Sequence, residues 1–337
     1  MSLNDLWFLL IAVLFTGFFF LEGFDFGVGM ATRTLAKGNL ERRVLINTIG
    51  PFWDANEVWL ITAAGAMFAA FPHWYSTLFS GYYLVLTFIL LALIARGVAF
   101  EFRSKVDNPR WQNVWDIAIF IGSLFPPLLF GIMFTSMIKG VPIDHNMHMS
   151  AGFFDIINGY SVWGGITITG LCFLHGLIFI SLRTTDDLRT RARTMATRWV
   201  PVQAVLLLVL VIWTAYATDL FQARFTLSMI IVALGVVAVA LTYAALRKGK
   251  EGLAFGMSGA TIILMVASMF VGLFPNVMIS TIDESFNLTV MNAASNPYTL
   301  KAMTIVAVCL LPFVLGYQIW SYYVFSKRVS TKDHLEY

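Results

Sequence analysis

The sequence predicts an all-α protein that crosses a membrane many times. Two observations lead to this fold class. The chain of 337 residues is 58% hydrophobic and only 12% charged, whereas a soluble domain carries roughly 25% charged residues. It also contains long apolar runs of the roughly 20 residues that a membrane-spanning helix needs. No region reads as strands, and the polar stretches between the runs are too short for a soluble domain.

Nine apolar runs are long enough to cross the membrane, and they are bounded by charged residues or by stretches rich in Pro, Gly and Asn. We therefore expect a polytopic membrane protein with nine transmembrane helices in one integral membrane domain, 1–337. The predicted helices cover residues 6–32, 55–72, 77–100, 115–138, 160–182, 199–218, 225–246, 254–275 and 300–325.

Each predicted helix has its own polar features. The first is uncharged until Glu22, and the second opens with acidic residues that follow a proline. The third holds one internal arginine, the fourth a pair of prolines and the fifth a single histidine. The sixth follows an arginine-rich segment, and a short basic turn separates the seventh from the eighth. The ninth follows a loop that contains Asn and Pro, and it precedes a polar tail.

The basic residues predict the orientation of the chain. Of the 22 Lys and Arg residues, 18 fall in the tail and in the loops after the first, third, fifth and seventh helices. Only Lys139, Arg224 and Lys301 fall on the opposite side. Because cytoplasmic loops carry an excess of Lys and Arg, we expect the N-terminus outside and the C-terminus in the cytoplasm.

Two proline segments raise the question of an internal duplication. Leu124-Phe125-Pro126-Pro127 lies in the fourth helix, and Leu273-Phe274-Pro275 ends the eighth. They would be equivalent if the first eight helices formed two four-helix bundles. Two unrelated membrane prolines are an equally good interpretation.

Several function classes find no support in the composition. The net charge of +3 does not indicate nucleic-acid binding, because the basic residues lie in short loops between apolar runs. Cys172 and Cys309 both fall in apolar runs, so we expect buried, inert cysteines rather than a disulfide or a metal site. No cleavable signal peptide is expected, because a basic segment before the first run is missing. No metal motif, phosphate loop or nucleophile triad occurs.

The acid Asp25 lies inside the first predicted helix, in Gly23-Phe24-Asp25-Phe26-Gly27. It precedes Arg33 by eight residues, so it sits about 12 Å from the cytoplasmic end of the helix. A carboxylate at this depth normally faces protein or a water-filled path, and the flanking glycines allow another helix to approach closely. Asp25 is therefore either a proton-relay group or an acid that only holds helices together.

A second acidic group opens the second helix, where Asp54 and Glu57 share one helix face beside Trp53. One interpretation is an ordinary helix start with an interfacial tryptophan. The other is the mouth of a proton path. Arg96 is the only basic residue in the interior of a predicted helix and needs a partner. Asp25 or Asp54 would serve, and so would a cofactor propionate or a quinone oxygen.

Three further groups have simpler interpretations. We expect Arg103 to be solvated at the membrane edge, and Asp116 to be an acid that stabilises the start of the fourth helix. His175 is the only histidine inside a predicted helix. A haem needs an axial His or Met, but a hydrogen-bonded interior histidine is the favoured interpretation.

Taken together, these segments resemble one family closely: subunit II of the cytochrome bd quinol oxidases of prokaryotes. The resemblance covers nearly the whole chain and is most specific in the N-terminal half. Its motifs are Glu22-Gly23-Phe24-Asp25-Phe26-Gly27-Val28-Gly29-Met30, Glu41-Arg42-Arg43 with Ile46-Asn47, Trp53-Asp54-Ala55-Asn56-Glu57-Val58-Trp59-Leu60, Phe100-Glu101-Phe102-Arg103-Ser104-Lys105, and Gly122-Ser123-Leu124-Phe125-Pro126-Pro127.

The resemblance implies two four-helix bundles, roughly 1–140 and 155–276, and a peripheral helix at 300–325. It implies a multi-pass protein of the prokaryotic plasma membrane that pairs with a haem-carrying subunit I and sometimes with a small accessory subunit. Subunit I would hold two haem b groups, one haem d and the quinol site. The complex would oxidise quinol, reduce dioxygen to water and take protons from the cytoplasm.

The resemblance also implies roles for individual residues. Asp25 and Asp54 would lie on a proton path at the subunit interface, with Trp53 and Arg96 nearby. Glu57 matches a position where the family also has an amide, and Arg96-Gly97 replaces an Arg-Pro pair of other members. A structural quinone near Trp53 and Arg96 is a further expectation. The alternative function is a proton-coupled secondary transporter that would use the same acids.

Overall fold

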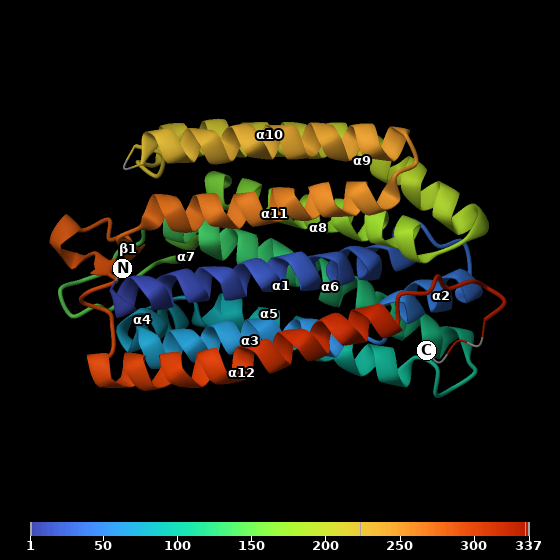
Figure 1. Cartoon of the computed structure of the whole chain (residues 1–337), viewed down its shortest axis with the longest axis horizontal. Coiled ribbons are helices and arrows are strands. Elements are labelled where there is room, and N and C mark those ends of the chain that lie inside the picture. The colour runs from blue at the N-terminus through green and yellow to red at the C-terminus, as the bar shows by residue number, and fades with distance from the viewer. Residues whose placement is uncertain (1, 223, 334, 336–337) are drawn as a thin grey trace.

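The computed structural model describes residues 2–222, 224–333 and 335, and this part of the chain is almost entirely helical (Figure 1). The long helices run side by side along the longest axis of the molecule. The elements in chain order are α1 (Leu3–Thr34), α2 (Asn39–Ile49), α3 (Trp53–Ala70), α4 (Pro72–Gly81), α5 (Tyr83–Phe102), α6 (Pro109–Lys139), α7 (Phe153–Ile156), α8 (Gly159–Arg183), α9 (Asp186–Ala217), α10 (Phe225–Arg247), α11 (Glu251–Leu273), β1 (Asn276–Met278), the 3-10 helix η1 (Glu284–Phe286), β2 (Leu288–Thr289) and α12 (Pro297–Val324).

Eight of the described helices are long and apolar enough to cross a membrane, namely α1, α5, α6, α8, α9, α10, α11 and α12. Helix α3 is the other predicted crossing. It has 18 residues, and Asp54, Asn56 and Glu57 make its first turns polar. The prediction of an all-helical membrane protein is confirmed by this architecture.

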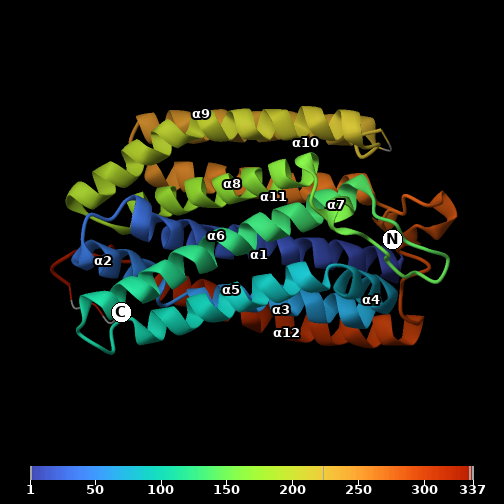
Figure 2. The same ribbon diagram turned by 180° about the vertical axis from the view of Figure 1, so that it is seen from behind.

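Helix α1 lies at the centre of the molecule and packs against α3, α6, α8 and α11 (Figures 1 and 2). The close approach predicted from its glycines is present. A Cβ atom on Gly27 would collide with the backbone of Cys172 and Gly176 on α8, and one on Gly29 would collide with Ser123 on α6. The glycines therefore let α1 approach α8 almost backbone to backbone and let it contact the Ser123 side chain of α6 closely.

Helix α12 is peripheral and lies along α1 and α3. Nearly all its apolar side chains are exposed, which is the expected pattern for a helix that faces lipid or another subunit. The expectation that both cysteines are buried is half right. Cys172 is buried on α8, whereas Cys309 is exposed on α12.

The predicted third helix, 77–100, begins later than expected. Helix α3 ends at Ala70, the separate helix α4 follows, and α5 starts only at Tyr83. Pro72 causes the break between α3 and α4, because it disfavours helical dihedral angles at the preceding residue and suits the first position of a new helix. The end of α4 at Gly81 then delays the start of α5. Apolar composition cannot report such a break, because all these segments are hydrophobic.

Two other boundaries differ from the prediction. Helix α2 occupies a segment predicted as a loop, and α9 begins at Asp186 rather than at 199 because its first turns extend beyond the apolar run. The proline segments are also not equivalent. Pro126 and Pro127 lie inside α6, whereas Pro275 follows the end of α11. The internal duplication therefore loses this support.

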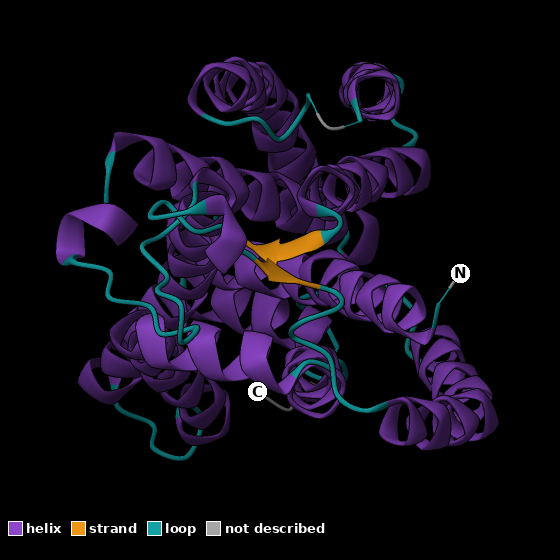
Figure 3. Cartoon of the chain, turned by 90° about the vertical axis from the view of Figure 1, so that its left-hand side faces the viewer, coloured by secondary structure: helices purple, strands orange, loops and turns teal. Residues whose placement is uncertain are grey.

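The prediction that no strand occurs is wrong. Strands β1 and β2 form a small antiparallel sheet in the loop between α11 and α12, with Asn276 opposite Thr289 (Figure 3). Strands of two or three residues are too short to show the alternating pattern that identifies a strand in a sequence. The sheet lies at the same end of the molecule as the N-terminus, while the C-terminal end lies towards the other end (Figure 1).

Candidate functional site

The candidate site is a cluster of buried carboxyl groups around one arginine. Glu22 and Asp25 are three residues apart on α1 and therefore lie on the same helix face. Arg96 of α5 donates hydrogen bonds to Glu22 and, at 2.6 Å, to Glu57 Oε1 of α3. The side chains of Glu22 and Arg96 are completely buried, and that of Glu57 is 20% exposed. Three helices thus contribute to one charged centre.

The partners of Arg96 differ from those expected. Neither Asp25 nor Asp54 is paired with it, and Glu22 and Glu57 hold it instead. The guanidinium also lies over the ring of Phe26, at 4.6 Å from the centroid. Such a charged group is stable away from water only with these partners. The arginine therefore fixes the positions of α1, α3 and α5 relative to one another.

Asp25 is held by an amide rather than by a cation. Its Oδ2 accepts a hydrogen bond of 2.7 Å from Asn56 Nδ2 on α3. Asn56 Oδ1 in turn accepts one of 2.8 Å from the hydroxyl of Tyr322 on α12. Asp25 and Asn56 are completely buried. This hydrogen-bonded chain links the central helix to the peripheral helix.

The cluster holds more acid than base. Glu22, Asp25 and Glu57 face a single guanidinium, so full ionisation would leave an excess of negative charge away from water, which is costly. Within the described residues, Glu22 Oε2, Asp25 Oδ1 and two nitrogens of Arg96, Nε and Nη1, have no hydrogen-bond partner. Buried polar atoms normally find a partner. Exchangeable protons or water molecules would meet both requirements.

Asp54 and Trp53 flank the cluster without joining it. Asp54 is exposed on the surface of α3. Trp53 packs against Phe100 of α5, with 5.3 Å between the ring centroids, and lies beside Gly97. The structure therefore places Glu57 between the buried cluster and the surface that carries Asp54.

Sequence reasoning did not assign roles to Asn56 and Tyr322. Asn56 could have been found, because it lies in the acidic segment that opens α3 and an amide is a common partner of a buried acid. The sequence showed Glu22 to be an acid inside a predicted membrane helix, but it did not show that Glu22 pairs with Arg96. Tyr322 carries no signal, because it is one of several aromatic residues in the last helix.

A second ionic cluster lies at the C-terminal end of α5. Asp116 of α6 accepts hydrogen bonds from Arg103 Nε at 2.6 Å and from Arg42 Nη1 at 3.0 Å. The expectations for Arg103 and Asp116 were wrong, because both side chains are almost fully buried. Helix α6 begins at Pro109, so Asp116 lies beyond its first turn, where the helix dipole has little effect.

Further ion pairs tie the polar end of the molecule together. Glu251 at the start of α11 pairs with Arg189 of α9 at 2.8 Å and with Arg328 of the C-terminal tail at 3.0 Å. Arg191 of α9 pairs with Glu41 of α2. Burial alone would raise the pKa of Glu41, but hydrogen bonds from Arg191 and from the backbone N–H of Lys37 hold it below its ordinary value. These contacts connect loops that are far apart in the sequence.

His175 is an interior histidine, as the favoured interpretation predicted. Its Nδ1 lies 2.7 Å from Ser258 Oγ of α11, and its ring stacks on Phe255 with centroids 4.4 Å apart. Phe20 and Phe24 lie against the same imidazole. His175 Nε2 is buried without a hydrogen-bond partner, but neither of the cavities described below is lined by His175, so the residues around it do not fit a group as large as haem. No cluster of three or more potential metal ligands occurs among the described residues.

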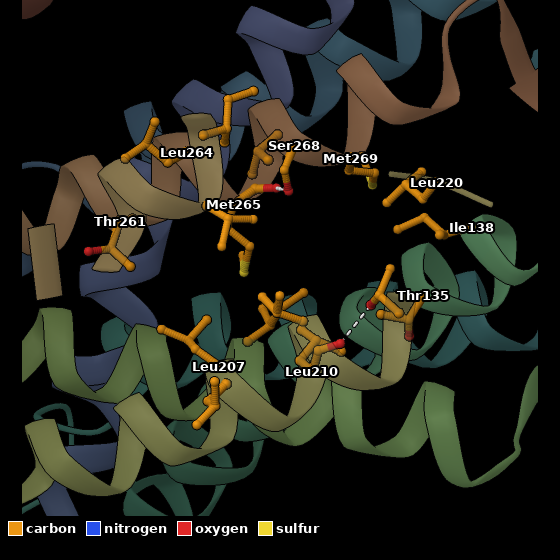
Figure 4. Close-up of a pocket in the computed structure, with 18 of the residues that line it drawn as sticks. Thr135, Ile138, Leu207, Leu210, Leu220, Thr261, Leu264, Met265, Ser268 and Met269 are labelled. Atoms are coloured by element: carbon orange, nitrogen blue, oxygen red, sulfur yellow. Dashed lines mark hydrogen bonds between the residues drawn. The ribbon is translucent and has the colours of Figure 1, made fainter. Parts of the chain in front are cut away.

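Two cavities lie among the helices. One of about 360 Å³ lies between α8, α9, α10 and α11, and its lining is mainly apolar, with Leu207, Leu264, Met265 and Met269 among the residues that point into it (Figure 4). The other, of about 440 Å³, lies between α1, α8 and α12. Neither cavity is lined by Trp53 or Arg96.

Comparison with known proteins identifies the family. A family model described as cytochrome bd terminal oxidase subunit II matches residues 3–325. The chain belongs to this family. The resemblance found in the sequence motifs is thereby confirmed. The alternative of a secondary transporter has no support.

Relatives of known function share the full length of this subunit II. Cytochrome bd ubiquinol oxidase subunit 2 of Bacillus subtilis is 56% identical over 336 residues, which cover 100% of this chain and 99% of the relative. Cytochrome bd-I ubiquinol oxidase subunit 2 of Escherichia coli K12 is 35% identical, with coverage of 98% and 96%. A chain of the bd oxidase from Geobacillus thermodenitrificans has the same fold, with a TM-score of 0.81 at 14% identity and coverage of 97% and 100%.

Membership of the subunit II family states the function at the level of the complex. The chain is one subunit of a terminal oxidase, an oxidoreductase of the bacterial inner membrane, and it works with a partner subunit. Haem groups belong to that complex.

Proposed function

We propose that the buried cluster of Glu22, Asp25, Glu57 and Arg96 forms part of the path by which protons reach the oxygen-reducing site of the complex. The observation that carries this proposal is three buried or nearly buried carboxyl groups around one arginine, with unpartnered polar atoms between them. Such a centre can hold and release protons. Glu57 would connect it to Asp54 on the surface of α3.

The same proposal includes the surface of this subunit that the partner subunit would cover. Asp54 is exposed on α3, and an acid near the membrane is favourable only where it meets water or protein. Large apolar side chains such as Ile61 on α3 and Leu91 on the following long helix α5 are exposed too. We infer that this surface packs against subunit I, which would carry two haem b groups, haem d and the quinol site. The reaction would be oxidation of quinol and reduction of dioxygen to water, and a small accessory subunit would find room elsewhere.

The orientation is part of the proposal as well. The ion pairs of Asp116, Glu251 and Glu41 gather the basic loops at one end of the molecule. The excess of Lys and Arg on cytoplasmic loops supports a cytoplasmic location for this end and an outside location for the N-terminus. With α3 as a ninth crossing, α1, α3, α5 and α6 would form one bundle and α8 to α11 the other, with α12 at the periphery.

A quinone near Trp53 and Arg96 remains a further proposal. Its support is the pair of unpartnered nitrogens on Arg96, which could donate to a quinone oxygen, and the neighbouring indole of Trp53. Water molecules on the proton path would satisfy the same nitrogens. The cavities described above lie elsewhere, so a bound quinone would require space at the interface with the partner.

The proton-path proposal is tested by Asp25→Asn and Asp54→Asn in the assembled oxidase. Both variants should slow quinol-dependent oxygen consumption, by about 10-fold or more for a lost proton-transfer group, while haem content stays normal. Asp107→Asn, which changes an exposed acid in the loop after α5, is the matched control and should behave as wild type. Wild-type turnover in both variants would refute the proposal, and loss of haem would show that the acids are structural.

A further inference from the structure

The contacts of Tyr322 extend the site to the peripheral helix. Its hydroxyl donates to Asn56 Oδ1 at 2.8 Å, and its ring stacks on Phe52 with centroids 4.3 Å apart and planes 3° apart. The hydroxyl is therefore held in place by the ring contact. Tyr322 also lines the cavity of about 440 Å³ that reaches Arg183, the last residue of α8.

The direction of these hydrogen bonds matters, because an amide has two different ends. The oxygen of Asn56 accepts from Tyr322, so its NH₂ group is turned towards Asp25. An N–H donor stabilises a carboxylate more than a protonated carboxyl group. If the amide turned over, its oxygen would face Asp25 and would favour the protonated acid. The tyrosine hydroxyl would then accept from the amide NH₂ and its own proton would lose the acceptor that it has at Asn56 Oδ1, so the hydroxyl favours the first orientation.

We propose that Tyr322 is a positioning residue of the proton path. By fixing the amide of Asn56, it presents an N–H donor to Asp25 at the moment when Asp25 has released its proton. The proton passes from the Asp25 carboxyl to the next acceptor of the path, and no bond of Tyr322 or Asn56 forms or breaks. This inference rests on the proposed role of Asp25. It gives the peripheral helix a function that its exposed surface does not suggest.

Other groups near Asp25 share its electrostatic environment, and all of them except Tyr322 are unchanged in the variants considered below. On α6 and α11, the side chains nearest this turn of α1 include Ser123 and Ile262, which do not titrate. The titratable and charged groups on the other elements around Asp25 are Glu22 of α1, Glu57 of α3, Arg96 of α5, Cys172 and His175 of α8, and Tyr322 itself.

The experiment compares Tyr322→Phe, Asp25→Asn and the double variant in the assembled oxidase, by oxygen consumption, haem content and pH dependence. Tyr322→Phe keeps the stacking on Phe52 and removes only the hydroxyl. We expect turnover to fall by roughly 5-fold, the size of one neutral hydrogen bond, with normal haem content. Tyr323→Phe removes a neighbouring hydroxyl from a side chain that is 78% exposed, and it should match wild type.

The double variant shows whether Tyr322 acts through Asp25. If it does, Tyr322→Phe causes no further loss in the Asp25→Asn background, because residues that act as a unit are not additive. The ratio of Tyr322→Phe to wild-type turnover should also change with pH, and this change should be absent in the Asp25→Asn background. Three results would each overturn the inference. The fold-losses in turnover of the two single variants could multiply in the double variant, Tyr322→Phe could turn over as wild type, or Tyr322→Phe could lose haem.

The outcomes separate this inference from the proposed proton path. If Asp25→Asn is slow and Tyr322→Phe is not, the positioning role fails and the proton path stands. If Asp25→Asn itself turns over as wild type with normal haem content, the proton path fails and the role of Tyr322 falls with it.

Discussion

A single guanidinium determines the chemistry of the buried cluster. Arg96 is completely buried, and two carboxyl groups from two other helices compensate its charge. Asp25 stands three residues from Glu22 but is held only by an amide. It is therefore the member of the cluster whose protonation state depends least on a salt bridge. In the proposed proton path, this difference would separate acids that hold helices together from the acid that exchanges a proton.

Removal of Arg96 should therefore destabilise the subunit more than removal of an exposed arginine. Arg96→Leu leaves Glu22 and Glu57 without a cation in a buried site, and breaking a buried pair in this way costs about 3–5 kcal/mol. We expect a lower thermal unfolding midpoint of the purified complex and less haem in the membranes. Arg110→Leu, at an exposed position in the first turn of α6, is the control. Equal midpoints for the two variants would contradict a structural role for the ion pairs.

The residues of this cluster also show how far sequence reasoning reaches. Asp25 and Arg96 were recognisable because charges inside apolar runs are rare and need a reason. Their partners were not recognisable, because pairing depends on which helix faces lie together. Arg103 was misjudged for the same reason. It lies near the end of an apolar run, yet α2 and α6 cover it completely.

At the scale of the helices, hydrophobic composition predicts where the apolar segments lie but not where one helix ends and the next begins. The two predicted helices 55–72 and 77–100 are in fact three, α3, α4 and α5, and Pro72 marks the first of the two breaks between them. Glycine was more informative than hydropathy. Gly27 predicted a close helix contact, and the structure provides it in α8. The partner helix itself could not be predicted, because glycine spacing says that a neighbour is close but not which neighbour it is.

The contact between α1 and α8 should tolerate no added side chain. A Cβ atom at Gly27 would meet backbone atoms of α8, which cannot move aside as a flexible side chain can. We expect Gly27→Ala to destabilise the purified complex by about 1–3 kcal/mol, the usual cost of overpacking. Gly256→Ala on α11 meets no atom within 4 Å and is the matched control. A thermal unfolding midpoint for Gly27→Ala equal to that of the control would show that the helices can separate without cost.

For the whole molecule, the asymmetry of charge is the clearest signal in the sequence. The basic loops meet at one end, where ion pairs such as those of Glu251 and Asp116 connect them. The opposite end holds the small sheet and the N-terminus (Figure 1). Alternation of the loops between the two ends requires α3 to cross the membrane, although its polar first turns make it the least apolar of the predicted crossings. The position of α3 thus decides on which side every later loop lies.

Labelling of single cysteines in intact cells tests this topology. In a chain without Cys172 and Cys309, a membrane-impermeant thiol reagent should reach Ser2→Cys and Asn146→Cys from outside, and Asp107→Cys only after permeabilisation. The three positions are exposed. If α3 did not cross, Ser2→Cys would still be labelled from outside, but Asp107→Cys would be labelled from outside as well. If the whole chain were inverted, only Asp107→Cys would be labelled in intact cells. The labelling pattern therefore distinguishes nine crossings in the proposed orientation from both alternatives. A missing crossing moves every later loop to the opposite side of the membrane, and an inversion moves all the loops.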